Sequence, residues 1–364
     1  MAIAERRALY QEIEDHRKRP LIVYVTSARR GAEGSFAADA VREFVDQLHA
    51  LPDETVNLDL LVNSMGGDGL TSWRLVSMIR ERIGSKGKFS VLVPHFAFSA
   101  ATLLALGADE IYMYPFACLG PIDPQITVTT KEGKQGFGYQ DVVAFAKFLE
   151  EEGKISEQTH LAQLLGPLIN EIKPSVLGAS KRSSSQSVTM AKRLLKMHMS
   201  GAEDQKADVI AESLNKSFFS HGHAVSPAEA KELGLKIKDD STLNDLMWKV
   251  YEDIEDETQA RNPFDPLAIC LADPQNRFLI DSPPVVNIPA NAPQQVVNQI
   301  WQASLQSIKT SQCIPKDYDL IHALIESTRH SSRFITKGKI FAARKPDLDY
   351  IIGAPKISQG WETL

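Results

Sequence analysis

Cysteine is scarce in this sequence of 364 residues. The three cysteines, Cys118, Cys270 and Cys313, are odd in number, far apart and without the spacing of metal ligands. They predict neither a disulfide framework nor a zinc site, and they fit a reducing compartment. We therefore expect no metal ion and no cofactor.

Long hydrophobic runs are also missing. No stretch approaches the roughly 18 to 20 apolar residues that a membrane-spanning helix requires. The first twenty residues alternate charges at helical spacing and lack the apolar core of a signal peptide. We expect a cytoplasmic protein without a membrane span.

The sequence has no excess of positive charge. It carries 40 Lys and Arg residues against 46 Asp and Glu residues, a net charge of −6. This balance gives no reason to expect nucleic acid as a partner. The phosphate-binding patterns GxxxxGK[ST] and GxGxxG are absent as well, so a nucleotide site is not expected.

Strand and helix patterns alternate over the first 115 residues. Apolar, β-branched runs at 21–25, 56–62, 89–93 and 110–114 predict strands that are covered on both faces. Apolar residues at helical spacing lie between them. Strands and helices that alternate in this way predict an α/β fold with a largely parallel sheet.

The pattern is weaker further along the chain. Glycines at 133, 136 and 138 indicate a loop or hairpin, and residues 226–237 predict a short closing helix and a last strand. The remaining helices are expected at 141–151, 158–172, 183–199 and 203–216, and in two patches at 294–309 and 317–328.

Composition changes near residue 245, where an acidic patch leads into a segment rich in proline. Proline at this density forbids long regular elements. We therefore divide the chain into an N-terminal helix at 1–19, a main domain at 20–245 and a C-terminal extension at 246–364 of unknown role.

Ser99 is the candidate nucleophile. It stands among small residues at the start of a predicted helix, directly after a strand. The positive end of a helix favours negative charge near such a hydroxyl. A serine among alanines is also a common helix cap or packing residue, and this stretch alone favours that interpretation.

Gly66 and Gly67 strengthen the case for a nucleophile. They follow a strand in the stretch NSMGG at 63–67, where no side chain shields the backbone amides. Acyl transfer needs N–H donors aimed at the oxyanion, each worth about 3 kcal/mol. The structural alternative is a tight turn or a phosphate-binding loop.

Four short stretches together resemble the serine dehydrogenase proteinase family. They are VNSMGG at 62–67, HFAFSAAT at 95–102, ADEI at 108–111 and LGPIDPQ at 119–125. The resemblance spans about 20–238 and is dense from 56 to 126. It implies the ClpP, signal-peptide-peptidase-A and crotonase-like fold, built from repeated ββα units.

The resemblance also implies an activity. A serine peptidase of this kind cleaves a peptide or protein substrate through an acyl-enzyme on Ser99, with oxyanion donors from Gly66 or Gly67 and from Ala100. Relatives often show Ser-Gly-Gly where this chain has Ser-Ala-Ala, which narrows or weakens the site. A homo-oligomer is the state that the resemblance implies.

The general base has two candidates. Lys181 lies near the position of the lysine of signal-peptide-peptidase-like members, and His221 matches a histidine of the proteinase family, with Asp123 to orient it. His221 needs no shift of its pKa to act near neutrality, whereas Lys181 needs a drop of about three units. A solvated lysine, a loop histidine and a turn aspartate are the alternatives.

Two other classes of function compete with the peptidase. A crotonase-type enzyme would use the same oxyanion turn on a CoA thioester, with acidic residues in the pocket. A catalytically silent scaffold or binding protein would keep the fold while Ser99 packs inward. The extension at 246–364 carries no motif that indicates a family, and we expect a partner-binding or regulatory module there.

Overall fold

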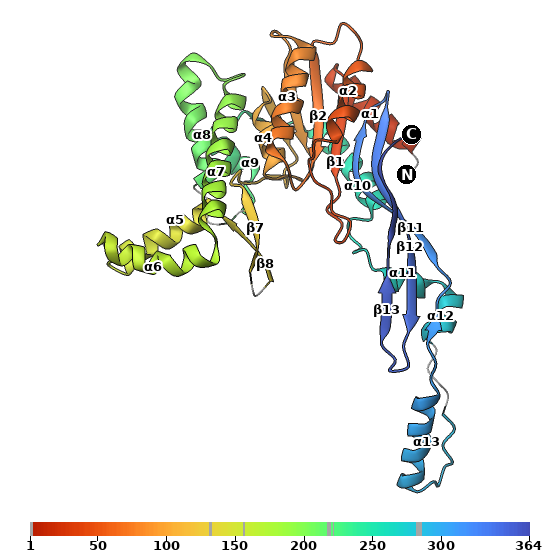
Figure 1. Ribbon diagram of the computed structural model, residues 1–364. Helices are drawn as coiled ribbons and strands as arrows, with labels where there is room; N and C mark the ends of the chain where they lie inside the picture. Colours follow the sequence, from red (N-terminus) through yellow and green to blue (C-terminus); the bar gives the residue numbers. More distant parts are fainter. Residues whose placement is uncertain (1–2, 131–132, 156, 217–219, 221, 282–285) are drawn as a thin grey trace.

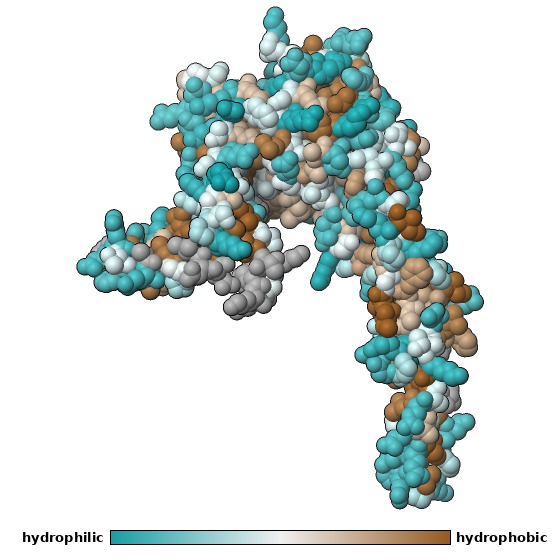
Figure 2. Space-filling model, in the orientation of Figure 1, coloured by the Kyte–Doolittle hydropathy of each residue, from teal (hydrophilic) through white to brown (hydrophobic). Residues whose placement is uncertain are grey.

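The computed structural model describes residues 3–130, 133–155, 157–216, 220, 222–281 and 286–364. A central sheet runs through the body of the molecule, and two projections extend from it (Figure 1). One projection carries α5, α6 and the β7–β8 hairpin. The other carries α11 to α13 and β13, and Figure 2 shows the hollow between the two.

The sheet joins strands from both ends of the chain. Its order is β10-β12-β11-β1-β2-β3-β5-β9. The parallel strands are β1 (Leu21–Thr26), β2 (Asn57–Asn63), β3 (Lys88–Val93), β5 (Glu110–Met113) and β9 (Ile237–Lys238). The antiparallel strands are β10 (Ser311–Gln312), β11 (Lys316–Glu326) and β12 (Ser331–Arg344).

Helices cover both faces of this sheet. Side chains alternate along each strand, so Ile22 and Tyr24 enter one core while Leu21 and Val23 enter the other. The first core is covered by α2 (Ala40–His49), α3 (Gly69–Ile83) and α4 (Ala100–Leu106). The second is covered by α1 (Ile3–Arg17) and α10 (Ser241–Thr258).

Shorter elements lie between the parallel strands in the sequence. They are β4 (Phe96–Ala97), β6 (Cys118–Leu119), β7 (Gln125–Thr130), β8 (Gly133–Gly138) and α9 (Pro227–Glu232). The adjoining helices are α5 (Tyr139–Lys147), a π-helix (Phe148–Glu152), α6 (Gln158–Glu171), α7 (Pro174–Leu195), a 3₁₀ helix (Gly201–Glu203) and α8 (Asp204–Lys216). The glycines at 133–138 form the predicted hairpin.

The C-terminal extension has a small core of its own, which includes Cys270, Ile280 and Ile340. Its further elements are α11 (Pro266–Ala272), α12 (Pro274–Asp281), α13 (Gln294–Ser307), β13 (Tyr350–Gly353) and β14 (Lys356–Thr363). Within the described part of α13, no residue is buried.

The helix predicted at 317–328 is wrong, because this segment forms β11. Its apolar residues at 320, 321, 324 and 325 recur at helical spacing. In the structure, β11 carries a bulge between Ile321 and Ala323, which shifts the strand's register against β12. The bulge breaks the two-residue alternation that identifies a strand.

The predicted α/β fold with a largely parallel sheet is confirmed. The boundaries at 19/20 and 245/246 stay predictions. β11 of the extension pairs with β1 in the same sheet, so the extension and the main domain share backbone hydrogen bonds. Among the described helices, none is both long enough and apolar enough to cross a membrane.

Candidate active site

The glycine turn follows the end of β2. Ser64 pairs with Ala97 of β4, which brings the turn beside the strand that leads into Ser99. Phe36 fixes the turn from the other side: its N–H donates to the Gly66 carbonyl at 2.7 Å, and its carbonyl accepts from the Asp68 N–H at 2.8 Å. The turn is therefore held between two segments.

Gly66 lies directly against the candidate nucleophile. Its φ is +100°, and a Cβ added there would sit 2.8 Å from the Ser99 Cβ and 2.6 Å from the Phe98 carbonyl oxygen. Both the conformation and the close approach require glycine. Gly67 has a φ of +141°, and a Cβ there would meet the Phe36 carbonyl oxygen at 2.4 Å.

Ser99 has a strained backbone at the start of α4. Its φ is +52° and its ψ is −113°, which is rare for a residue with a Cβ, and its side chain does not cap the helix. Ser72 supports the following turn, because its hydroxyl donates to the Ala100 carbonyl at 2.6 Å. Strain of this kind costs on the order of 1–3 kcal/mol and gathers at functional sites.

Two backbone amides near Ser99 are available to a ligand. The Gly66 N–H is already used, since it donates to the Ser64 hydroxyl at 3.0 Å. The N–H groups of Gly67 and Ala100 have no hydrogen-bond partner among the described residues. Both residues line the same cavity as Ser99, so the turn and the first turn of α4 present free donors to one space.

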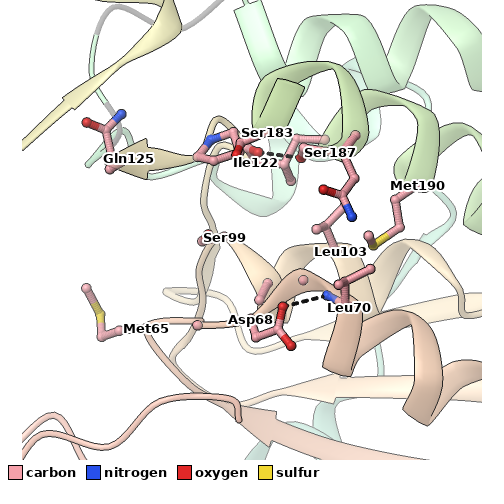
Figure 3. A pocket seen from close by; sticks show the side chains of 15 residues that line it. Met65, Asp68, Leu70, Ser99, Leu103, Ile122, Gln125, Ser183, Ser187 and Met190 are labelled. Atoms are coloured by element: carbon pink, nitrogen blue, oxygen red, sulfur yellow. Dashed lines mark hydrogen bonds between the residues drawn. The ribbon is translucent and has the colours of Figure 1, made fainter. Parts of the chain in front are cut away.

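The cavity has a volume of about 410 Å³ (Figure 3). Its floor comes from the glycine turn and α4, and its roof comes from α7 and the segment before β7. The side chains on the roof are Ile122, Pro124, Gln125, Ser183, Gln186, Ser187 and Met190. These side chains are apolar or uncharged polar groups, which suits an uncharged ligand more than a strongly charged one.

The α7 wall of the cavity was not predicted from the sequence. Ser187 is buried and donates to the Ile122 carbonyl at 2.5 Å, which joins α7 to the segment before β7. A signal was present, because Ser180, Ser184 and Ser187 are buried on α7 at helical spacing. Buried hydroxyls at that spacing indicate a helix face that meets polar groups.

Lys181 lies on the opposite side of α7 from this wall. At 100° per residue, it points about 180° away from Met190, which lines the cavity. Its ammonium lies 4.3 Å from the centre of the Tyr139 ring, and the side chain is exposed. The structure does not bring Lys181 and Ser99 together, so its role as a base stays a prediction.

Asp123 is half-buried beside the cavity without lining it. Its carboxylate accepts from the Gln125 side-chain amide at 2.9 Å. His221, the other predicted base, lies outside the described residues. The chain on both sides of it is anchored near the site: the Leu214 carbonyl accepts from the Ile122 N–H at 2.9 Å, and Val225 pairs with Leu119.

His95 and His223 both contact side chains outside the Ser99 cavity. Nδ1 of His95 lies 2.8 Å from the Tyr251 hydroxyl, and burial lowers the pKa of this histidine. Nε2 of His223 lies 3.1 Å from both carboxylate oxygens of Glu229. Neither histidine lines the cavity described above.

One group of described residues has the spacing of metal ligands. Single ligand atoms of Glu43, Asp46 and His330 lie within 4.8 Å of one another, on α2 and on the turn between β11 and β12. Asp46 is already paired with Arg42. None of these residues lines the cavity beside Ser99.

The fold and the strand–turn–helix arrangement define an α/β protein whose glycine turn faces a serine at a helix start. Residues 37–132 match the model of the ClpP-like SDH-type serine proteinase family. The matched range contains the glycine turn and Ser99. The resemblance to the serine dehydrogenase proteinase family is confirmed over this range.

Two curated relatives match a longer part of the chain. Both are uncharacterized proteins of Methanocaldococcus jannaschii. One is 28% identical over 205 residues, which are 56% of this chain and 58% of the relative. The other is 27% identical over 213 residues, which are 58% of this chain and 62% of the relative. Each match spans less than two thirds of the relative's own length.

Two solved structures of a membrane-bound stomatin-specific protease, 1510-N, are also similar. The first, a mutant, has 16% sequence identity and covers 63% of this chain and 83% of its own. The second, a mutant in complex with a substrate peptide, has 17% identity and covers 63% and 78%. Both have a TM-score of 0.37, too low to define this chain's activity.

Proposed function

We propose that this protein is a serine peptidase that forms an acyl-enzyme on Ser99. The observation that carries the proposal is the placement of Ser99, in a strained conformation on the wall of a cavity that also receives two unbonded amides. The family match over 37–132 supports a peptidase-like function. The substrate class is a peptide or protein.

In this mechanism the Ser99 hydroxyl attacks the peptide carbonyl. The Gly67 and Ala100 N–H groups bind the oxyanion, and each donor contributes about 3 kcal/mol to the transition state. Gly66 takes a different role, because its N–H is bound to Ser64. Its missing side chain leaves room for Ser99 and Ala100 to approach the turn.

The base in this proposal is His221, with Asp123 as its orienting partner and Lys181 as the alternative. Lys181 would have to leave the Tyr139 ring and pass around α7 to reach Ser99. A histidine near neutrality acts without a large pKa shift.

The cavity gives less support to the two competing functions. A crotonase-type reaction needs a free acid or base, but Asp68, the carboxylate among the described lining residues, caps α3 by accepting from Leu70 and Thr71. A silent scaffold would bury the serine, whereas Ser99 is half-exposed on the cavity wall.

A fluorophosphonate probe tests the nucleophile. We expect Ser99→Ala to abolish covalent labelling and to lower peptidase activity by about 10³-fold or more, because the nucleophile is gone. Ser183→Ala, which changes another serine of the same cavity, should keep the label. Labelling that persists in Ser99→Ala with wild-type stability would overturn the assignment.

The same labelling assay distinguishes between the two candidate bases. His221→Ala should lose labelling at neutral pH, while Lys181→Ala should keep it. The reverse result would assign the base to Lys181. If both variants keep the label, the base is another group.

A further inference from the structure

Two thiols meet in the C-terminal extension, in a part of the molecule separate from the Ser99 cavity. Cys270 lies on α11 and Cys313 directly follows β10, and their sulfur atoms are 3.7 Å apart. Cys270 is fully buried in the small core of the extension, whereas Cys313 is half-exposed at its edge.

The surrounding contacts hold the segments that carry the two thiols beside each other. Cys313 exchanges two hydrogen bonds with Ala342 of β12: its N–H donates to the Ala342 carbonyl at 2.8 Å, and its sulfur accepts from the Ala342 N–H at 3.0 Å. The side chain of Asn276 on α12 bonds both backbone groups of Ile314. An ion pair between Asp273 and Lys316 closes the same junction.

We propose that Cys270 and Cys313 form a reversible disulfide when the protein meets a hydroperoxide. A disulfide bond is about 2.05 Å long, so the sulfur atoms must approach each other by less than 2 Å. A rotation of the half-exposed Cys313 side chain that breaks the hydrogen bond from the Ala342 N–H would supply that movement. The proposal is independent of the peptidase activity proposed for Ser99.

The chemistry needs two steps. The Cys313 thiolate attacks the peroxide, the O–O bond breaks, and Cys313 becomes a sulfenic acid while the peroxide leaves as water or an alcohol. The Cys270 sulfur then attacks the sulfenic sulfur. The S–O bond breaks, and the hydroxide leaves as water with the proton of Cys270. Two thiols lose two electrons and the hydroperoxide gains them.

The order of the steps follows from exposure. Cys313 reaches solvent and so meets the oxidant first, while Cys270 is enclosed and resolves the sulfenic acid. Burial, together with the contact to Cys313, raises the pKa of Cys270 to about 11. Lys316 lowers this pKa and Asp273 raises it. The second step should therefore be faster at alkaline pH.

The bond would close a ring that contains α12 and α13. The two cysteines are 43 positions apart, and α13 contributes no buried residue of its own. A covalent link between α11 and the end of β10 fixes the base of this projection (Figure 1). Oxidation should slow the unfolding of the extension and leave the Ser99 cavity unchanged.

Intact mass spectrometry of the full chain after treatment with hydrogen peroxide tests the proposal. We expect the loss of two hydrogen atoms, and a non-reducing peptide map in which the Cys270 and Cys313 peptides are linked. Dithiothreitol should restore the original mass. Cys118→Ser is the matched control and should behave as the wild type does.

Cys313→Ser should show no cross-link, and it leaves the buried Cys270 side chain intact, so its folding is less at risk than that of Cys270→Ser. The map of the wild-type protein decides the question even if a variant fails to fold. Oxygen addition at Cys313 without a cross-link would overturn the proposal, as would a cross-link through Cys118 or between two chains.

Discussion

At the scale of single residues, Gly66 allows the glycine turn to pack directly against the proposed nucleophile, Ser99. We expect Gly66→Ala to lower the free energy of unfolding by about 2 kcal/mol or more, because the new Cβ is strained at a φ of +100° and meets Ser99 and Phe98. Fluorophosphonate labelling should fall with it. Chemical denaturation and labelling measure the two effects.

Gly84→Ala is the matched control for strain alone. Gly84 also has a positive φ, of +72°, but no atom lies within 4 Å of its added Cβ. Its cost should stay near 1 kcal/mol, with full labelling. Equal stability and equal labelling in the two variants would contradict the close packing of Gly66 on Ser99.

The sequence predicted Ser99 and the glycine turn because both carry local signals. It could not show which amide is free, since that depends on Phe36 and Ser64, which bond to the turn from other segments. The sequence also could not predict which side of α7 faces the cavity. A serine-rich helix has no obvious apolar face, so the position of Lys181 relative to the cavity was not readable.

At the scale of elements, one buried arginine joins α1, α10 and β11. Arg6 is fully buried and pairs with Glu326 at 2.9 Å and Asp253 at 2.6 Å. Replacement by methionine removes the guanidinium that both buried carboxylates share, so Arg6→Met should cost about 3–5 kcal/mol in thermal or chemical denaturation. Arg42→Met removes an exposed pair and should cost at most about 1 kcal/mol. Similar costs would argue against a buried network.

The same cluster makes stability depend on pH. Burial alone would raise the pKa of Glu326, but the charge and hydrogen bonds of Arg6 lower it on balance. A carboxylate with a lowered pKa in the folded state stabilises the fold above its unfolded pKa of about 4.3, and this contribution is lost as the pH falls through the folded value. The difference between wild type and Arg6→Met should therefore shrink below about pH 4.

The elements predicted from the sequence were those with a regular pattern of apolar residues. The parallel strands β1, β2 and β3 are short apolar runs because helices cover both of their faces. β11 was mistaken for a helix because its bulge and its pairing with β1 and β12 are long-range features. Local periodicity does not record such pairing.

At the scale of the whole molecule, the extension completes the sheet. A chain that ends at residue 309 would lose β10, β11, β12, β13 and β14, and β1 would become an edge strand. We expect this variant to aggregate or to melt at a much lower temperature than the full chain, because an exposed, apolar edge invites pairing with other chains. Solubility and thermal melting measure the effect.

Deletion of residues 290–308 is the control for this truncation. It removes α13, which has no buried residue, and keeps the strands of the extension. Its melting temperature should stay close to that of the full chain. A stable, soluble fragment 1–245 would instead support the predicted boundary at 245/246. The homo-oligomer also stays a prediction, which light scattering of the full chain can test.

The pairing of β1 with β11 joins two segments that the ribosome makes far apart in time. Val25 leaves the ribosome long before its partner Leu324. At roughly 5–20 residues per second, β1 must wait on the order of 15–60 s for the strand that covers its edge. The nascent chain therefore carries an open apolar edge through most of its synthesis, and its yield in cells should respond to the supply of chaperones that bind such edges.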